Sequence, residues 1–180
     1  MTVTLQEFIS LGERQSLLEW CDAHPEYLCV SHTPDGEPYL LRKISNSNAI
    51  AAGGGFPAVA YEIQTRIRER FPMLGETLPR FHDGMVVGVL LPGGEFPTHT
   101  DEKFRDDAGR VCVGVNALIQ APESGGVLHV NGVDHPQQAG DAVAFLLSER
   151  PHGVSSVAGT VPRIVWSWRF MVERSAWESQ

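Results

Sequence analysis

The feature that most constrains the fold is the series of short apolar segments that follows Met85, each ended by turn-forming residues. Glycine-containing turn signals recur at 92–94, 107–109, 124–126, 131–132 and 139–140. The apolar segments between them predict strands at 85–91, 96–101, 111–118, 127–130, 141–147, around His152 and at 163–172. Many short strands at near-regular spacing are typical of a β-sandwich or a β-barrel.

The first 84 residues have a different pattern, which predicts two helices and a pair of strands. An apolar stripe from Leu5 to Trp20 indicates the first helix, and Thr4-Leu5-Gln6-Glu7 fits a capping box that would start it at Thr4. The second helix is expected from Pro57 to Phe71, with strands at 27–32 and 38–42. The polar, glycine-rich segment 45–55 is expected to be a connector, with a mobile lid as the alternative.

Composition limits the class of protein. A chain of 180 residues predicts one domain, 1–180, in which residues 1–84 support a β core at 85–172. The net charge of −8 argues against a protein held on nucleic acid by a basic surface. The chain shows no signal peptide, and no stretch has the ~18 apolar residues needed to span a bilayer. Together with three cysteines that lack CxxC spacing, this predicts a cytoplasmic protein with reduced thiols and no membrane contact. The oligomeric state is left open.

His99, Asp101 and His152 carry the clearest chemistry in the sequence. Residues two apart in a strand point to the same face, so His99 and Asp101 would both face the barrel interior. A closed barrel can bring His152 to the same spot. Two imidazoles and one carboxylate are the ligand set of the facial-triad Fe(II) site. The alternatives are that His99 hydrogen-bonds a neighbouring loop and that His152 lies on the surface at a strand end.

The segment 163–170 predicts a two-faced strand with a polar side. Alternation places Arg163, Ser167 and Arg169 on one face, with the aromatic residues opposite, packed against helices. A buried arginine is costly unless it is paired, and a guanidinium binds a carboxylate with two parallel hydrogen bonds. The partner of Arg163 is therefore either an Asp or Glu of the protein or the carboxylate of a bound molecule.

In this order and with these gaps, the motifs resemble the Fe(II)- and 2-oxoglutarate-dependent oxygenases, particularly the compact prolyl-hydroxylase-like branch. The resemblance covers residues 85 to 170. It implies a mainly β fold with N-terminal helices, a double-stranded β-helix or jelly roll. It also implies catalytic metal ligands at His99, Asp101 and His152, the cofactor Fe(II), the co-substrates 2-oxoglutarate and O2, and ascorbate as a supporting additive. Arg163 would then bind the distal carboxylate of 2-oxoglutarate.

The co-substrate contacts depart from the family pattern at one place. Relatives often have Ser or Thr two residues after the arginine, where this chain has Val165, so Ser167 is the expected substitute. Asn116 lies within an apolar run and needs polar partners, either the co-substrate or a structural hydrogen bond.

Candidate substrate contacts are Phe104, Arg105 and His129. Phe104 and Arg105 belong to the charged run after Asp101, which forms either a solvated loop or a substrate loop, and 101–110 is a second possible lid. His129 either lines the pocket or is a satisfied core or rim histidine.

The expected function is hydroxylation of a C–H bond in a small molecule, such as an amino acid or a specialised metabolite. Three alternatives stay open. They are hydroxylation of a peptide or protein residue, a cupin-like metalloenzyme that does not use 2-oxoglutarate, and a non-catalytic jelly-roll binding module.

Overall fold

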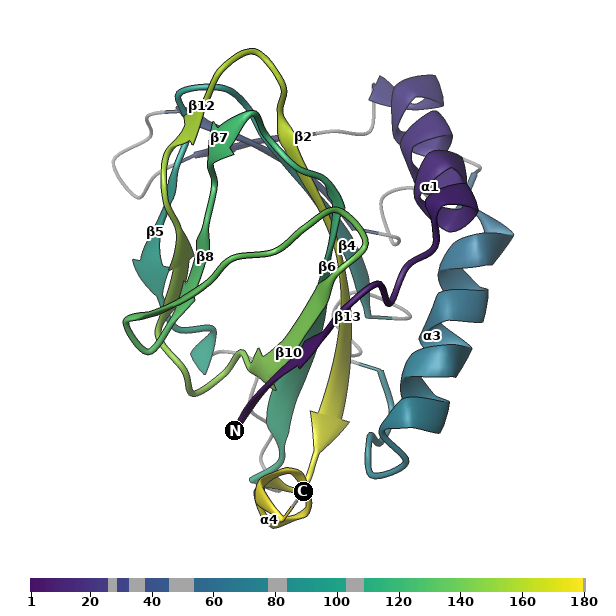
Figure 1. Cartoon of the computed structure of the whole chain (residues 1–180). Coiled ribbons are helices and arrows are strands. Elements are labelled where there is room, and N and C mark those ends of the chain that lie inside the picture. Colours follow the sequence, from purple (N-terminus) through teal and green to yellow (C-terminus); the bar gives the residue numbers. More distant parts are fainter. Residues whose placement is uncertain (26–28, 33–37, 46–53, 78–83, 103–108, 180) are drawn as a thin grey trace.

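The computed structural model describes residues 1–25, 29–32, 38–45, 54–77, 84–102 and 109–179. Helices α1 (Leu11–Ala23) and α3 (Ala58–Arg70) lie on one face of a large sheet, and a smaller sheet faces its other side (Figure 1). A short helix, α4 (Arg174–Glu178), follows the last strand. No helix among the described residues is long and apolar enough to cross a membrane.

The large sheet has seven strands, and every neighbouring pair is antiparallel. In spatial order they are β1 (Thr2–Leu5), β10 (Ala142–Leu146), β6 (Val111–Gln120), β13 (Arg163–Val172), β4 (Met85–Leu90), β3 (Pro38–Ser45) and β2 (Cys29–His32). Three of them, β1, β2 and β3, come from the first 45 residues, so the N-terminal region extends the same sheet on both sides.

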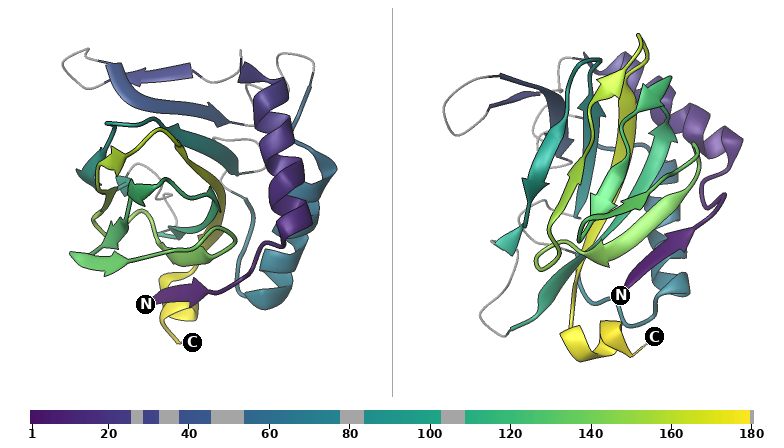
Figure 2. Two further views of the ribbon diagram at one scale, coloured as in Figure 1. Left: turned by 45° about the horizontal axis from the view of Figure 1, so that its top comes forward. Right: turned by 60° about the vertical axis from the view of Figure 1, so that its left-hand side comes forward.

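The small sheet completes the barrel. Its four strands are β5 (Phe96–His99), β11 (His152–Val154), β8 (Leu128–Val130) and β9 (Val133–His135). A two-stranded ribbon, β7 (Ser124–Gly125) with β12 (Val157–Ala158), lies at one end. Figure 2 shows the two sheets rolled around a common interior, with both helices outside. The prediction of a jelly-roll, double-stranded β-helix fold with N-terminal helices is confirmed.

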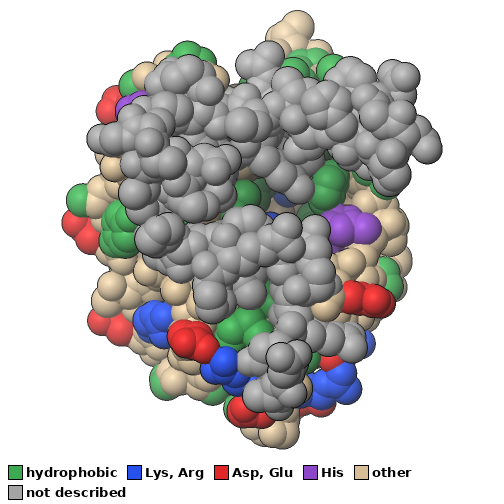
Figure 3. All heavy atoms as spheres, turned by 180° about the vertical axis from the view of Figure 1, so that it is seen from behind, with side chains coloured by type: hydrophobic (Ala, Val, Ile, Leu, Met, Phe, Trp, Pro, Cys, Tyr) green, Lys and Arg blue, Asp and Glu red, His purple; other side chains and the backbone are tan. Residues whose placement is uncertain are grey.

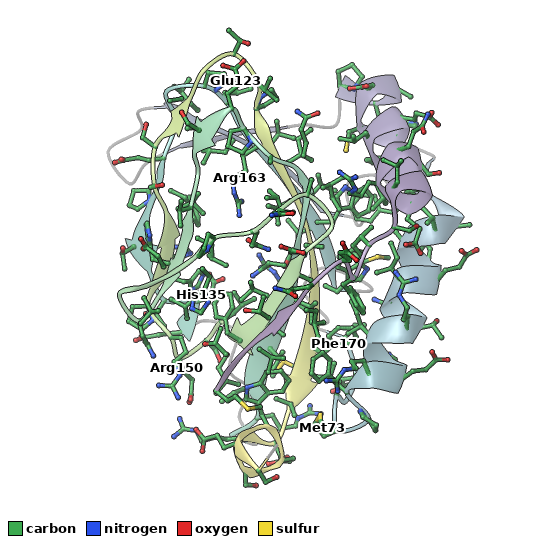
Figure 4. All side chains as sticks on the ribbon, viewed as in Figure 1. Met73, Glu123, His135, Arg150, Arg163 and Phe170 are labelled. Atoms are coloured by element: carbon green, nitrogen blue, oxygen red, sulfur yellow. The ribbon has the colours of Figure 1, made fainter. Side chains whose placement is uncertain are left out.

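Strand β13 separates the two halves of the core. Trp166, Trp168 and Phe170 are fully buried on the helix side, where the ring centroids of Trp166 and Phe56 lie 4.7 Å apart and Trp168 Nε1 donates to the Ala60 carbonyl at 3.0 Å. Arg163 projects from the same strand into the barrel (Figure 4). The predicted alternation of an aromatic outer face with a polar inner face is confirmed.

The start of the first helix is the clearest correction. The first 13 residues contain two Ser/Thr-x-x-Glu sequences, Thr4 to Glu7 and Ser10 to Glu13, and the helix uses the second one. Ser10 is the N-cap of α1, its Oγ accepts from the Glu13 amide at 3.4 Å, and the Ser10 amide donates to Glu13 Oε2 at 2.8 Å. Thr4 instead lies in β1, which pairs with β10 at the sheet edge. The predicted start at Thr4 is wrong because sheet pairing prevails over the local capping signal.

The second helix follows its prediction. Pro57 is the N-cap residue of α3, and the helix ends before Phe71. An ion pair of 2.7 Å between Arg66 and Glu13 joins α3 to α1. The two helices therefore cover the outer face of the large sheet as one connected layer.

Two further expectations concern the cysteines and the possible lids. Cys21 and Cys112 are buried and unpaired, as expected for reduced thiols. The possible lids at 45–55 and 101–110 lie largely outside the described residues.

On the face shown in Figure 3, acidic and basic side chains of the described residues are interspersed, so the net charge of −8 is not gathered into one patch there.

Candidate metal centre and co-substrate site

The structure brings His99, Asp101 and His152 together inside the barrel. Strands β5 and β11 are neighbours, and His99 lies opposite His152 in their register. Asp101 follows two residues after His99, and its amide donates to the Leu147 carbonyl at 3.1 Å. Asp101 Oδ1 lies 3.9 Å from His99 Nε2, and Oδ2 lies 4.0 Å from His152 Nε2. The three potential ligand atoms lie within 4.8 Å of one another.

Both imidazoles are oriented by the backbone immediately before them. The Nδ1 of His99 lies 3.0 Å from the Pro97 carbonyl oxygen, and the Nδ1 of His152 lies 2.8 Å from that of Arg150. A carbonyl can only accept, so each Nδ1 carries the proton. The lone pair of each ring is therefore on Nε2, which points toward Asp101. A hydrogen bond from the non-ligating nitrogen is the usual support of a metal-binding histidine.

Burial keeps His152 neutral. Loss of contact with water lowers the pKa of His152 to about 4, and the hydrogen bond to the Arg150 carbonyl opposes that shift. The rings of Phe145 and Phe96 pack against the two imidazoles, with centroids 5.1 Å from His152 and 4.4 Å from His99 respectively. The cluster thus combines two imidazole nitrogens with a carboxylate, which is the donor set of a divalent metal site. No other group of three such residues gathers elsewhere in the described part of the chain.

Arg163 is a buried cation without a carboxylate partner in the described residues. It is 6% exposed, and its Nη2 donates to Gln137 Oε1 at 3.3 Å. Its Nε is buried without a hydrogen bond, and no described Asp or Glu forms an ion pair with it. Burial lowers its pKa to about 10, so it still carries its charge at neutral pH. The alternative of an internal salt bridge is therefore not seen among the described residues, and a bound anion fits this position.

Two polar residues share the inner face with Arg163. Ser167 and Asn116 are opposite each other in the pairing of β13 with β6, so both lie in the barrel. The Ser167 hydroxyl accepts a long hydrogen bond of 3.5 Å from Arg169 Nε, and the Asn116 carbonyl accepts from Gln137 at 3.2 Å. Their predicted contact with a co-substrate stays a prediction.

Two residues near the site were not assigned a role by the sequence. Arg169 lies on the inner face near Asp101 and Cys112; burial lowers its pKa, and the negative charge of Asp101 opposes that shift. Gln137 holds Arg163 from the connection between β9 and β10. Strand alternation was sufficient to place Arg169 inside, whereas nothing in the sequence marks Gln137.

His129 lies away from the metal cluster. It is opposite Gly153 in the pairing of β8 with β11, whereas His152 is opposite Val130. Its side chain therefore projects from the other face of the small sheet, where Nδ1 lies 3.2 Å from Asp134 Oδ1. The structure does not bring His129 to the site, in agreement with the rim-histidine alternative. Phe104 and Arg105 lie outside the described residues.

A cavity of about 110 Å³ opens at the Arg163 end of the barrel. Its wall includes Gly126, Leu128, His135 and Gln137. The three metal-ligand candidates are not part of it. Gln137 connects this cavity with Arg163, because it belongs to the wall of the first and its side chain contacts the second.

Sequence comparison with family models and with curated proteins finds no match. Solved structures with similar folds include a collagen prolyl hydroxylase of Paramecium bursaria Chlorella virus-1 in complex with 2-oxoglutarate, with a TM-score of 0.68 and 18% identity over 96% of each chain. A prolyl-4-hydroxylase of Pseudomonas putida is similar with a TM-score of 0.62 and 22% identity, over 96% of this chain and 92% of that one.

A third similar structure is that of an epimerase. It is SnoN, a non-haem α-ketoglutarate-dependent epimerase of nogalamycin biosynthesis, with a TM-score of 0.69 and 12% identity over 95% of this chain and 76% of that one. The chain therefore has the double-stranded β-helix fold of 2-oxoglutarate-dependent oxygenases, in the compact form that prolyl hydroxylases have.

Proposed function

We propose that this protein is an Fe(II)- and 2-oxoglutarate-dependent oxygenase that hydroxylates a C–H bond. The observation that carries the proposal is one barrel interior that holds both a His-Asp-His cluster and a buried arginine with no carboxylate partner among the described residues. The cluster suits non-haem Fe(II), because three protein ligands leave three coordination positions for other molecules. The arginine suits the distal carboxylate of a dicarboxylic acid that also reaches the metal.

The residues of the chain have distinct tasks in this reaction. Bound Fe(II) supplies the oxidising chemistry with O2 and 2-oxoglutarate. His99, Asp101 and His152 hold the ion, and the backbone carbonyls of Pro97 and Arg150 keep the two imidazoles aimed at it. Arg163 orients the co-substrate by a charge-assisted, two-pronged contact.

Apolar side chains keep water away from the reacting atoms. The barrel interior around the site is formed by Leu90, Leu128, Val130, Val143, Phe145, Leu147, Val154, Val157 and Met171. In such surroundings the charge of Arg163 is not screened by solvent, which strengthens its attraction for a carboxylate.

For the substrate, we favour a small molecule such as an amino acid or a specialised metabolite. The net charge of −8 disfavours a nucleic-acid substrate. A peptide or protein residue is the second candidate, since the similar structures include prolyl hydroxylases as well as an epimerase of nogalamycin biosynthesis.

The test is formation of succinate from 2-oxoglutarate with Fe(II), ascorbate and O2. The protein should form succinate even without its substrate. The His152→Ala variant should not form it. A substrate screen by mass spectrometry should then find a gain of one oxygen, with amino acids and proline-containing peptides as separate arms. A cupin-like metalloenzyme would react without 2-oxoglutarate, and a binding module would form no succinate. Either result would reject the proposal.

A further inference from the structure

Gln137 is the hydrogen-bonding partner of Arg163 in the described structure. Its Oε1 accepts from Arg163 Nη2 at 3.3 Å. Its Nε2 faces two backbone carbonyls, that of Asn116 at 3.2 Å and that of Asp141 at 3.3 Å. The side chain thus links the loop before β10 to the inner faces of β6 and β13.

These contacts leave the amide only one orientation. Both acceptors of Nε2 are carbonyl oxygens, which cannot donate, so the amide nitrogen must be on that side. The amide oxygen then has to face Arg163. The guanidinium is held from one side, and its other N–H groups, including the unbonded Nε, remain available.

The neutrality of Gln137 matters as much as its shape. A carboxylate at the same position would form an ion pair with Arg163, and this pair would compete with any carboxylate that binds there. Because Gln137 accepts only one neutral hydrogen bond, the positive charge of Arg163 stays uncompensated by the described residues. The site is held ready for an anion.

Gln137 also belongs to the wall of the neighbouring cavity of about 110 Å³, while its Oε1 contacts the guanidinium. A shorter side chain at this position would leave space for water beside Arg163. Hydration would then weaken the attraction of Arg163 for a carboxylate.

We propose that Gln137 is a positioning residue for Arg163, which fixes the guanidinium for the distal carboxylate of 2-oxoglutarate and must be neutral to do so. This inference rests on the proposed function. It also gives the site a specificity requirement: because Gln137 is neutral, the bound ligand must supply the negative charge that balances Arg163.

Three variants test the proposal. Gln137→Glu keeps the size and adds the competing charge, at the loss of the two hydrogen bonds that Nε2 donates. Gln137→Leu keeps the bulk and removes all three hydrogen bonds. The matched control is Gln138→Glu, which makes the same charge change one residue away on an exposed side chain. Calorimetric titration of 2-oxoglutarate into the Mn(II)-loaded protein gives Kd without turnover. Succinate assays with Fe(II) give KM and kcat, and thermal unfolding shows that each variant is folded.

We expect Gln137→Glu to weaken 2-oxoglutarate binding by about ten-fold or more, because the new ion pair must be broken. Gln137→Leu should weaken it by about three- to ten-fold, the effect of losing the one hydrogen bond that Gln137 makes to Arg163. Gln138→Glu should match the wild type. The Tm of Gln137→Glu without 2-oxoglutarate combines two opposed effects: the introduced carboxylate neutralises the buried charge of Arg163, but it faces the two backbone carbonyls that accept from Nε2 in the wild type.

Equal Kd values for Gln137→Glu and Gln138→Glu would overturn the inference. So would a fall in Tm and kcat of Gln137→Leu with Kd unchanged, since that pattern means a purely structural role. A wild-type protein that neither binds 2-oxoglutarate nor forms succinate would reject the proposed function itself, and the role of Gln137 with it.

Discussion

The two ends of the barrel interior are built in different ways. At the metal end, each histidine is oriented by a carbonyl two residues before it, and Asp101 comes two residues after His99. At the other end, Arg163 depends on Gln137, twenty-six residues before it in the chain, and on the close approach of Gly126. One end is thus organised by local sequence and the other by tertiary contacts.

This difference affects how each end responds to change. The imidazoles of the metal cluster are oriented by carbonyls two residues before them and need no distant partner for this. The Arg163 end holds a charge that the described residues leave uncompensated in an apolar interior, which costs folding free energy in the absence of a ligand. We therefore expect substitutions of the metal ligands to affect activity most, and substitutions around Arg163 to affect co-substrate binding and stability together.

The largest expected effect comes from the metal end. His152→Ala removes one of three ligands and should lower the rate of succinate formation by more than the roughly 10–100-fold typical of residues that only support a ligand. Fe(II) binding, measured by calorimetry without O2, should weaken in parallel. His129→Ala is the matched control, because His129 lies on the other face of the small sheet and should leave both quantities unchanged. Normal turnover in His152→Ala would disprove the cluster as the metal site.

The second effect concerns the co-substrate. Arg163→Ala should raise the half-saturation concentration of 2-oxoglutarate by about 100-fold, since a buried charged hydrogen-bonded pair contributes on the order of 2–5 kcal/mol. Arg163→Lys should be milder, because the charge stays and the planar two-pronged contact is lost. Fe(II) affinity should be the same in all three proteins. An unchanged half-saturation would place the anchor elsewhere.

The contrast between the two ends also explains what the sequence could predict. Period-2 alternation placed His99 with Asp101, and Arg163 on the inner face, because strand geometry is local. It could not identify Gln137, which lies in a connection without periodicity. For His129 the sequence left both the pocket and the rim open, and only the pairing of β8 with β11 places its side chain on the other face of the small sheet.

The two capping-box sequences show the same limit. Thr4 and Ser10 have equal local signals, since each is followed three residues later by a glutamate. Only the pairing of β1 with β10, between segments more than 130 residues apart in the chain, decides between them. Local patterns therefore predicted that a helix exists near the N-terminus, while a tertiary contact determined where it starts.

Removal of the buried charge should separate stability from function. Arg163→Met has a similar length and no charge, so the protein without 2-oxoglutarate should gain about 1 kcal/mol or more in free energy of unfolding. The same variant should lose its response to 2-oxoglutarate, which raises the Tm of the metal-loaded wild type by binding the folded state. Thermal unfolding with and without 2-oxoglutarate measures both. A loss of stability in Arg163→Met would mean that Arg163 is adequately compensated within the protein.

The smallest expected effect tests how tightly Arg163 is enclosed. Gly126 and Gly132 both have φ in the left-handed region, +63° and +74°, so alanine at either costs about 1–2 kcal/mol of backbone strain. Only at Gly126 would the new Cβ meet other atoms, 2.9 Å from Pro122 Cγ and 3.0 Å from Arg163 Cδ, whereas at Gly132 nothing lies within 4 Å. Gly126→Ala should therefore displace the arginine and raise the half-saturation concentration of 2-oxoglutarate a few-fold. Gly132→Ala should lower stability by a similar amount and leave that concentration unchanged. Equal half-saturation concentrations of 2-oxoglutarate in the two variants would show that Arg163 still binds when its aliphatic stem is shifted. Tertiary contacts would then restrain this end of the barrel less than the burial of Arg163 implies.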